Sequence, residues 1–390
     1  VVGAEELPDA FAAYADTAYD IYQMWIVTDI SKYLKKEELN EYISAYLEEG
    51  KFGSHDEIML FPIAKSTEVL ILNQTDWANF EQATGASIEE FSTWEGIVRT
   101  AEAYYNWTDQ LTDEPDDGKA LFGRDAMANY MIIGSLQLGH EIFKVENGEV
   151  TYDFDKDTMK KLWDNYYVPY VNGYFASRGM FRSDDVKTGD IIASVASTSG
   201  ATYFPSSVAK EDGTNYEIET KVYPVPNFEG TNPYAVQQGA GMVVLKSEEV
   251  REYATILFLK WFTEIENNVD FSISSGYLPV KQGANIESEI TKAIDNSGEI
   301  PTILQEALFA GIKTTQEYQL YTTKAFANGY SARSVLDTAL ESKAKADYEK
   351  VLKLMETGES REKAVANFTT EENFNNWFEE TRGSLLSTGE

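Results

Sequence analysis

Three signals follow one another between residues 237 and 280, and their order restricts the possible folds of this chain more than any other feature. The run Gln237-Gln238-Gly239-Ala240-Gly241-Met242-Val243-Val244 ends in apolar residues and indicates a strand. Ser247 can then cap a helix whose apolar stripe is expected to pack into a core, namely Val250, Ala254, Leu257 and Trp261. A turn follows at Ser274-Ser275-Gly276-Tyr277-Leu278-Pro279-Val280. Strand, helix and turn therefore succeed one another within about 45 residues, a spacing typical of α/β units.

The rest of the chain repeats this alternation of strand and helix. Val69-Leu70-Ile71-Leu72 predicts a buried strand, and the capping signal Ser92-Thr93 predicts a helix over 93–107. A further helix is expected at 155–172. Ile191-Ile192-Ala193-Ser194-Val195 predicts a short strand that leads into Ser197-Thr198-Ser199-Gly200. These patterns favour an α/β fold in which helices flank sheets.

Length and charge narrow the functional classes. The 390 residues exceed what one hydrophobic core usually serves, so two lobes are expected. The formal charge of −33 repels phosphate backbones and anionic membrane surfaces at long range, so nucleic acid is not an expected partner. The chain contains no cysteine, which excludes disulfides, thiolate nucleophiles and cysteine-ligated metals. No cofactor and no metal site are expected.

The motifs in this sequence give little support to a catalytic function. No Gly-x-Ser-x-Gly elbow and no phosphate-cradling loop occurs, and Gly239-Ala240-Gly241 has Val244 where a dinucleotide fingerprint needs its third glycine. The carboxylate pairs Asp116-Asp117, Asp184-Asp185 and Glu89-Glu90 could be proposed as the acid and nucleophile of a glycosidase. Adjacent residues in a strand or helix do not point at a shared site, so we interpret these pairs as solvated faces. An enzyme is not expected, and a glycoside hydrolase remains a distant alternative.

Five stretches together resemble one family. They are the turn at 274–280, Leu7-Pro8-Asp9-Ala10-Phe11 with Tyr14 and Asp16 behind it, the strand region 62–73, Thr93-Trp94-Glu95, and Asn328-Gly329-Tyr330-Ser331-Ala332-Arg333. In order and spacing they are similar to the extracellular solute-binding proteins of ABC importers, in the family 1 branch that takes carbohydrates or glycerol 3-phosphate. The resemblance covers the chain from Leu7 to about Ser384.

The resemblance implies a two-lobed α/β fold of the periplasmic-binding-protein-like type II, with a cleft between the lobes. Family members begin with a strand, a helix and a second strand before the Leu-Pro-Asp segment, which here starts at residue 7. The first lobe is therefore expected to lack its opening strands. The expected division is lobe 1 at 1–76 plus 239–300, crossing segments at 77–92 and 236–238, and lobe 2 at 93–235 plus 301–390.

The resemblance also implies a set of ligand-binding residues around the cleft. We expect Tyr14, Asp16, Ser66 and Thr67 from the first lobe, and Asp125, Asn129, Ser197, Thr198, Ser199 and Arg333 from the second. Gln238 and Gly239 lie near a crossing, and Tyr277 would lay its ring against the solute. No catalytic residue and no metal ligand belongs to this set.

The implied function is capture of a small polar solute by hinge closure and its delivery, unchanged, to an ABC transporter permease. A carbohydrate is the preferred solute, because Ala15 follows Tyr14 where glycerol-phosphate binders carry a glutamate. Glycerol 3-phosphate or a glycerophosphodiester is the second candidate, with Arg333 facing the anion. A surface adhesin that binds no small ligand is a third. The protein is expected to be a monomer outside the cytoplasm, as a cell-surface lipoprotein of a Gram-positive bacterium whose signal and lipid-accepting cysteine lie outside this chain.

Overall fold

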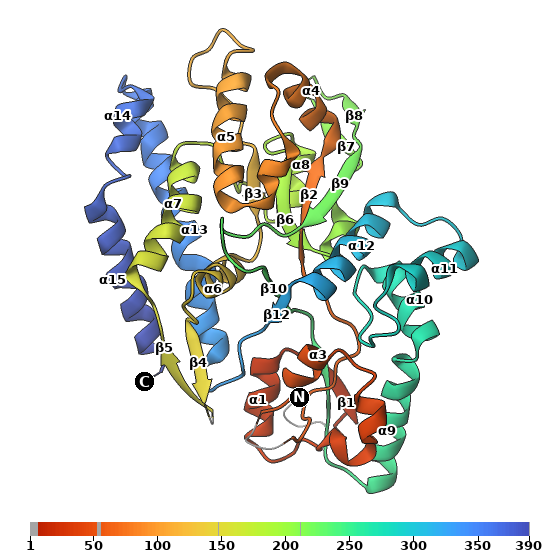
Figure 1. The fold of residues 1–390 in the computed structure, drawn as a ribbon. Coiled ribbons are helices and arrows are strands. Elements are labelled where there is room, and N and C mark those ends of the chain that lie inside the picture. The colour runs from red at the N-terminus through yellow and green to blue at the C-terminus, as the bar shows by residue number, and fades with distance from the viewer. Residues whose placement is uncertain (1–6, 53–55, 147, 211, 390) are drawn as a thin grey trace.

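Two lobes lie next to each other in the computed structural model, which describes residues 7–52, 56–146, 148–210 and 212–389 (Figure 1). The smaller lobe, at the bottom of the view, holds the N-terminal elements and the long helix α9 (Glu249–Phe262). The larger lobe carries the C-terminal helices on one flank. Within the described residues, none of the helices combines the length and the apolar character needed to cross a lipid bilayer.

A four-stranded sheet forms the centre of the larger lobe. Its order is β3 (Phe122–Arg124), β6 (Ala193–Ser197), β2 (Glu68–Asn73) and β9 (Thr220–Pro224). β2 is antiparallel to both of its neighbours, with Leu70 opposite Val195 on one side and Tyr223 on the other. Every residue of β2 is buried, which explains why this strand has a continuous apolar run instead of an alternating pattern.

The position of β2 bears on where the lobes divide. The expected division assigned residues up to 76 to lobe 1, whereas β2 pairs with two strands of the 93–235 segment. A strand held on both edges moves with its sheet. We therefore propose that the chain first crosses between the lobes near Ser66 and Thr67, before β2 begins.

Helices cover both faces of this sheet. Leu70 and Leu72 of β2 face the large cluster built by α5 (Trp94–Asp109), α6 (Met127–Gln137) and α7 (Lys156–Val171). The alternate residues Val69 and Ile71 face a smaller cluster that includes residues of α8 (Arg182–Lys187) and α12 (Thr302–Glu317). The remaining elements of lobe 2 are α4 (Gln74–Thr84), α13 (Gly329–Glu356), α14 (Arg361–Ala366), α15 (Glu371–Ser387), the hairpin β4 (Phe143–Glu146) with β5 (Glu149–Tyr152), and the hairpin β7 (Ser207–Ala209) with β8 (Asn215–Glu217).

Local capping explains where two of the predicted helices begin. The Thr93 hydroxyl accepts a hydrogen bond from the Gly96 backbone N–H at 3.1 Å, as the Ser92-Thr93 signal predicts for α5. The Asp155 carboxylate accepts one from the Thr158 N–H at 2.8 Å at the start of α7. Both helices then extend over the predicted ranges to within two residues.

The described part of the smaller lobe contains only a narrow sheet. β1 (Ala10–Ala13) and β11 (Gly241–Val244) pair antiparallel, and single bridges join Val27 to Leu245 and Phe61 to Met242. Short helices accompany this pair in the smaller lobe, together with α9 and the two helices that follow it. They are α1 (Ala15–Tyr22), α2 (Lys36–Leu39), α3 (Ser44–Glu48), α10 (Ile265–Ser275) and α11 (Glu287–Ser297).

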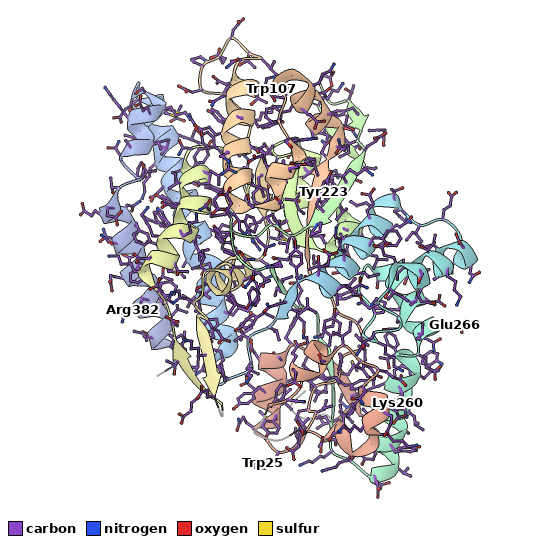
Figure 2. The ribbon with its side chains drawn as sticks, in the orientation of Figure 1. Trp25, Trp107, Tyr223, Lys260, Glu266 and Arg382 are labelled. Atoms are coloured by element: carbon purple, nitrogen blue, oxygen red, sulfur yellow. The ribbon has the colours of Figure 1, made fainter. Side chains whose placement is uncertain are left out.

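The apolar stripe predicted for α9 is not buried, so that prediction is wrong. Val250, Leu257 and Trp261 are 75%, 42% and 52% exposed, and Ala254 is exposed as well. The buried residues of α9 are Ile256 and Leu259, on another face. Ser247 is not the cap either, because the helix begins after Glu248. Figure 2 shows Lys260 of α9 and Glu266 of α10 along the outer flank of this lobe.

Three segments run along the boundary between the lobes. The first, around Ser66, pairs with the second at Gln238, and the third contains β12 (Gln319–Tyr321), which is parallel to β10 (Tyr234–Val236). In the third segment, Ala325 belongs to a buried cluster of lobe 1 while the next residue, Phe326, belongs to the main cluster of lobe 2. Of these segments, only the second overlaps a crossing expected from the sequence, at 236–238; the first precedes the other expected crossing at 77–92, and no crossing was expected around the third.

Candidate functional site

A cavity of about 1590 Å³ opens between the two lobes where the boundary segments run. Tyr14, Ser66 and Tyr277 line it from the side of lobe 1, and Asn129 and Ser199 line it from lobe 2. Ligand pockets for drug-sized molecules are typically about 300–1,000 Å³, so this cavity has room for a larger guest.

The floor of the cavity is a backbone ladder. The Ser66 N–H donates to the Gln238 carbonyl at 2.8 Å, and the Gln238 N–H donates back to the Ser66 carbonyl at 3.0 Å. Gly239 follows with φ of 103°, a conformation that other residues rarely adopt. A side chain at Gly239 would also approach the Ala64 carbonyl oxygen to 3.2 Å. The boundary segments can therefore lie close together only because glycine occupies this position.

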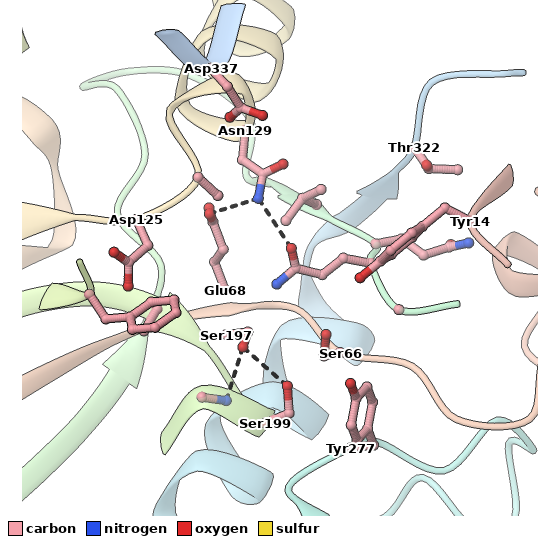
Figure 3. Close-up of a pocket in the computed structure, with 18 of the residues that line it drawn as sticks. Tyr14, Ser66, Glu68, Asp125, Asn129, Ser197, Ser199, Tyr277, Thr322 and Asp337 are labelled. Atoms are coloured by element: carbon pink, nitrogen blue, oxygen red, sulfur yellow. Dashed lines mark hydrogen bonds between the residues drawn. The ribbon is translucent and has the colours of Figure 1, made fainter. Parts of the chain in front are cut away.

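A buried polar network joins this floor to lobe 2. The Glu68 Oε1 atom accepts hydrogen bonds from Arg124 Nη2 at 2.7 Å and from Asn129 Nδ2 at 2.8 Å. Asn129 Nδ2 also lies 3.2 Å from Gln238 Oε1, as the dashed lines in Figure 3 show. The Arg333 guanidinium donates to Asn129 Oδ1. Asn129 is thus oriented by three partners and fixes Arg333 at the wall of the cavity.

The carboxyl of Asp16 faces the same region from lobe 1. Burial raises its pKa from 3.8 to about 6, the Arg333 charge opposes this shift, and Asp20 and Glu49 add to it. Gly329, at the start of α13, allows this approach, because a side chain there would lie 2.6 Å from Asp16 Oδ1. Asp16 therefore lines the cavity as a carboxyl whose pKa is raised to about 6.

A second buried ion pair lies at the boundary between the lobes. Lys65 pairs with Glu49, and both side chains are almost completely buried. Gln237 Nε2 donates to Glu49 Oε2 at 2.7 Å, while Lys65 Nζ donates to the Gly239 carbonyl at 2.8 Å. The charge of Glu49 is therefore neutralised by a neighbour, and it adds little net charge to the cavity it lines.

Two turns from opposite lobes meet at one side of the cavity. Ser197 Oγ lies 3.1 Å from Ser199 Oγ and accepts a hydrogen bond from the Gly200 N–H at 2.9 Å. Gly276 ends α10 with φ of 75°, and a side chain there would lie 2.7 Å from the Thr198 carbonyl oxygen. Tyr277 thereby comes to lie near Ser199 and Ser66 (Figure 3).

Asp125 lies on the other side of the cavity. Its Oδ1 atom accepts from the Arg182 backbone N–H at 3.2 Å and from Arg182 Nε at 3.3 Å. Burial raises the pKa of Asp125, although the Arg182 charge opposes this effect. The carboxylate is positioned by α8 and keeps an exposed side toward the cavity.

Most of the residues expected at the site lie together around this cavity. Those that line it are Tyr14, Asp16, Ser66, Asp125, Asn129, Ser197, Ser199, Gln238, Gly239, Tyr277 and Arg333. Thr67 and Thr198 do not line it. The Thr67 hydroxyl donates to the Val236 carbonyl at 2.8 Å, and Thr198 is fully buried with its methyl group beside Gly311. Both residues hold boundary segments in place.

Several lining residues were not among those expected. Glu68 and Tyr330 lie inside stretches that carried the family resemblance, so their positions could have been read from the sequence. Phe181, Tyr203 and Glu49 gave no such signal. Aromatic residues are usually buried, yet Tyr203 is 80% and Tyr330 73% exposed. Exposed rings around a cavity offer flat surfaces to a ligand.

Several solved structures have a similar fold. The cyclic α-maltosyl-1,6-maltose binding protein of Arthrobacter globiformis aligns with a TM-score of 0.68 at 13% identity, covering 98% of this chain and 85% of the other. UgpB of Mycobacterium tuberculosis, in complex with glycerophosphocholine, aligns with a TM-score of 0.66 at 16% identity and the same coverage. The ABC substrate-binding protein Lmo0181 of Listeria monocytogenes, in complex with cycloalternan, aligns with a TM-score of 0.60 at 16% identity, covering 97% of this chain and 86% of the other.

These likenesses confirm the two-lobed α/β fold expected from the sequence. No curated protein matches the sequence. A family model described as bacterial extracellular solute-binding protein matches residues 3–301, which is most of the chain. The chain therefore belongs to the bacterial extracellular solute-binding proteins.

Proposed function

We propose that this protein is the extracytoplasmic substrate-binding component of an ABC importer and that it captures a carbohydrate by closing its two lobes. The observation that carries this proposal is the lining of the cavity, in which hydroxyl, amide and carboxylate groups from both lobes alternate with exposed aromatic rings. Such a lining matches a ligand that carries many hydroxyls and flat apolar ring faces. Because both lobes contribute groups, a bound ligand stabilises the closed state over the open one.

The charge balance of the cavity supports a neutral ligand. Arg333 and Lys187 are the cationic residues among the described lining residues, whereas six carboxylates line the same space: Asp16, Glu49, Glu68, Asp125, Asp184 and Asp337. Lys65 and Arg124 neutralise Glu49 and Glu68, and Arg182 pairs with Asp125. Asp125 and the other three carboxylates still present acceptor oxygens to the cavity. Carboxylate oxygens accept hydrogen bonds from sugar hydroxyls and repel phosphate.

A glycerophosphodiester is the second candidate, and one contact supports it. Arg333 bonds to the neutral amide oxygen of Asn129 instead of to a carboxylate, so its charge is not fully compensated. A structural neighbour, UgpB, was solved with glycerophosphocholine. A phosphate placed beside Arg333 could take up this charge.

Isothermal titration calorimetry distinguishes these candidates. The protein is titrated with maltose, maltotriose, cellotriose, glycerol 3-phosphate and glycerophosphocholine, and the recovered ligand is analysed by chromatography. We expect one of the sugars to bind, to be recovered intact and to reduce the radius of gyration in X-ray scattering. Hydrolysis of a glycan would instead support the glycosidase alternative, and failure of every small ligand to bind or to change the scattering would support an adhesin.

Partners and location follow from the same proposal. We expect an ABC permease as the membrane partner, a monomeric state in solution, and no binding to nucleic acid at a formal charge of −33. A cell-surface lipoprotein of a Gram-positive bacterium is the setting we propose. Light scattering coupled to size exclusion tests the monomer directly.

A further inference from the structure

The cavity extends beyond the space between the lobes. Part of its lining comes from lobe 2 alone, from α8, from the inner end of β6 and from the 3-10 helix at Ser199–Tyr203. We call this part the lobe 2 arm and define it by Phe181, Ser183, Asp184, Lys187, Ser194 and Tyr203. Val186 of α8 and Phe204 share a buried cluster with Ile71 of the central sheet, so these elements form one packed unit. The arm is thus a preformed part of lobe 2.

The arm lies away from the residues contributed by lobe 1. In Figure 3, Asp125 is on one side of the view and Tyr14 and Tyr277 are on the other, with Ser197 between them. The hydrogen bonds from Arg182 hold Asp125 next to α8, where the arm begins. A ligand that reaches from Tyr14 into the arm must therefore be elongated.

The side chains of the arm suit a sugar ring. Phe181 and Tyr203 line it while remaining 57% and 80% exposed, so each presents ring surface to the cavity. At the inner end, Ser194 is 1% exposed and its hydroxyl has no hydrogen-bond partner in the described protein. A buried hydroxyl without a partner is unfavourable, and a ligand hydroxyl can satisfy it.

The charges of the arm do not favour an anion. Lys187 is accompanied by Asp184 and by Asp125 at the entrance. Asp184 already accepts a hydrogen bond from the Phe181 N–H at 3.1 Å, which fixes its carboxylate beside the ring. The combination of ring surface, hydroxyls and carboxylates matches the central cavity in kind.

We propose that the lobe 2 arm is a second sugar-binding subsite and that the physiological ligand is an oligosaccharide, not a monosaccharide. One end of this ligand contacts Tyr14, Asn129 and Arg333, and the other end enters the arm between Phe181 and Tyr203. This inference rests on the proposed carbohydrate function and adds the length and orientation of the ligand.

Binding measured against chain length tests the subsite. Calorimetry with glucose, maltose, maltotriose and maltotetraose, and with the cello- and xylo-oligosaccharides of the same lengths, gives Kd for each member of the series. In the series that binds, we expect Kd to fall at least tenfold between the monosaccharide and a three- or four-ring member. Phe181→Ala should raise the Kd of the longest member about tenfold and that of the shortest member less, because one ring contact is lost only where a ring is present.

Met180→Ala is the matched control. Met180 is 83% exposed, precedes Phe181 directly and is not part of the cavity lining, so its truncation should leave the whole length series unchanged. Ser194→Ala should weaken the longest member without lowering the melting temperature of the free protein, since its hydroxyl has no protein partner to lose.

The outcomes separate this inference from the proposed function. If no sugar of any length binds, the carbohydrate function is refuted and the subsite with it. If sugars bind but the monosaccharide binds as tightly as the longest member, or if Phe181→Ala acts equally on all lengths, the central site stands and the arm is not a subsite.

Discussion

The strongest prediction concerns Asp16, whose burial destabilises the folded protein at neutral pH. Its pKa is about 6 in the folded state and 3.8 when it is exposed. Since one pKa unit corresponds to about 1.4 kcal/mol, the ionised carboxylate lowers the free energy of unfolding by at most about 3 kcal/mol. Asp16→Asn keeps the size of the side chain and removes the charge. The variant should therefore be more stable than the parent above pH 6.

The sign of the pH dependence follows from the two pKa values. Below pH 3.8 the carboxyl is protonated in both the folded and the unfolded protein, and its ionisation contributes nothing to stability. As the pH rises toward 6, the unfolded chain ionises first, so the parent loses stability over this window. Above pH 6 both states are ionised and the full cost is present. The gain from Asp16→Asn should thus be small at pH 4 and reach its plateau by about pH 7.

Urea denaturation at pH 4, 5, 6, 7 and 8 measures this gain, with Asp20→Asn as the matched control. Asp20 lies one turn further along α1 and is exposed, and its charge contributes less than burial to the raised pKa of Asp16. Its neutralisation should therefore change stability by less than about 0.5 kcal/mol at every pH. A gain from Asp16→Asn that does not vary with pH, or a loss at pH 8, would refute the reasoning. The same variant should bind its solute more weakly if the carboxylate accepts a sugar hydroxyl.

Three further predictions follow from the contacts described above. Glu68→Gln leaves the buried Arg124 without its charge partner and should lower the free energy of unfolding by about 3–5 kcal/mol in urea denaturation. The control Glu90→Gln breaks an exposed pair with Arg99 and should lower it by less than about 1 kcal/mol. Equal losses in the two variants would contradict the role of burial. If the ligand is a glycerophosphodiester, Arg333→Ala should reduce its affinity by more than about 30-fold in calorimetry. If the ligand is a neutral sugar, the same variant should change its affinity by less than about tenfold. The reverse pattern would make the phosphate ester the preferred ligand. Gly276→Ala should destabilise the protein by roughly 1–2 kcal/mol and weaken solute binding, because the added carbon meets the Thr198 carbonyl oxygen and the backbone φ is 75°. Unchanged binding in calorimetry would show that this contact between the lobes is not needed.

The sequence predicted best those elements whose signals are local. β2 was visible as a continuous apolar run, and α5 and α7 were visible from their caps and spacing, because capping and burial of a short strand depend on neighbouring residues. The stripe on α9 shows the limit of this reasoning. Periodicity identifies an apolar face of a helix, but only the tertiary structure decides whether that face is covered, and here Val250 and Trp261 are exposed.

The candidate site was predictable in outline and not in detail. Tyr14, Ser199 and Tyr277 are far apart in the sequence and line one cavity, as expected from the order and spacing of the stretches that resemble the family. Thr67 and Thr198 lie beside lining residues but do not line the cavity themselves. Neighbouring side chains of an extended chain point in opposite directions, which separates Thr67 from Ser66 and Glu68. Thr198 instead lies in a helical turn after β6, with its side chain buried beside Gly311. Phe181 and Tyr203 could not be found from the sequence, because the sequence does not show whether an aromatic side chain is exposed or buried.

The junction at Ala325 and Phe326 limits how the molecule can move. These two consecutive residues are anchored in the interiors of opposite halves, so no slack polypeptide is available between them. Any rotation of one lobe relative to the other must then occur about very few backbone bonds at this point, which would act as a hinge. The two lobes are therefore expected to close along one reproducible path. Each closed, solute-bound molecule would then offer the same outer surface to its transport partner.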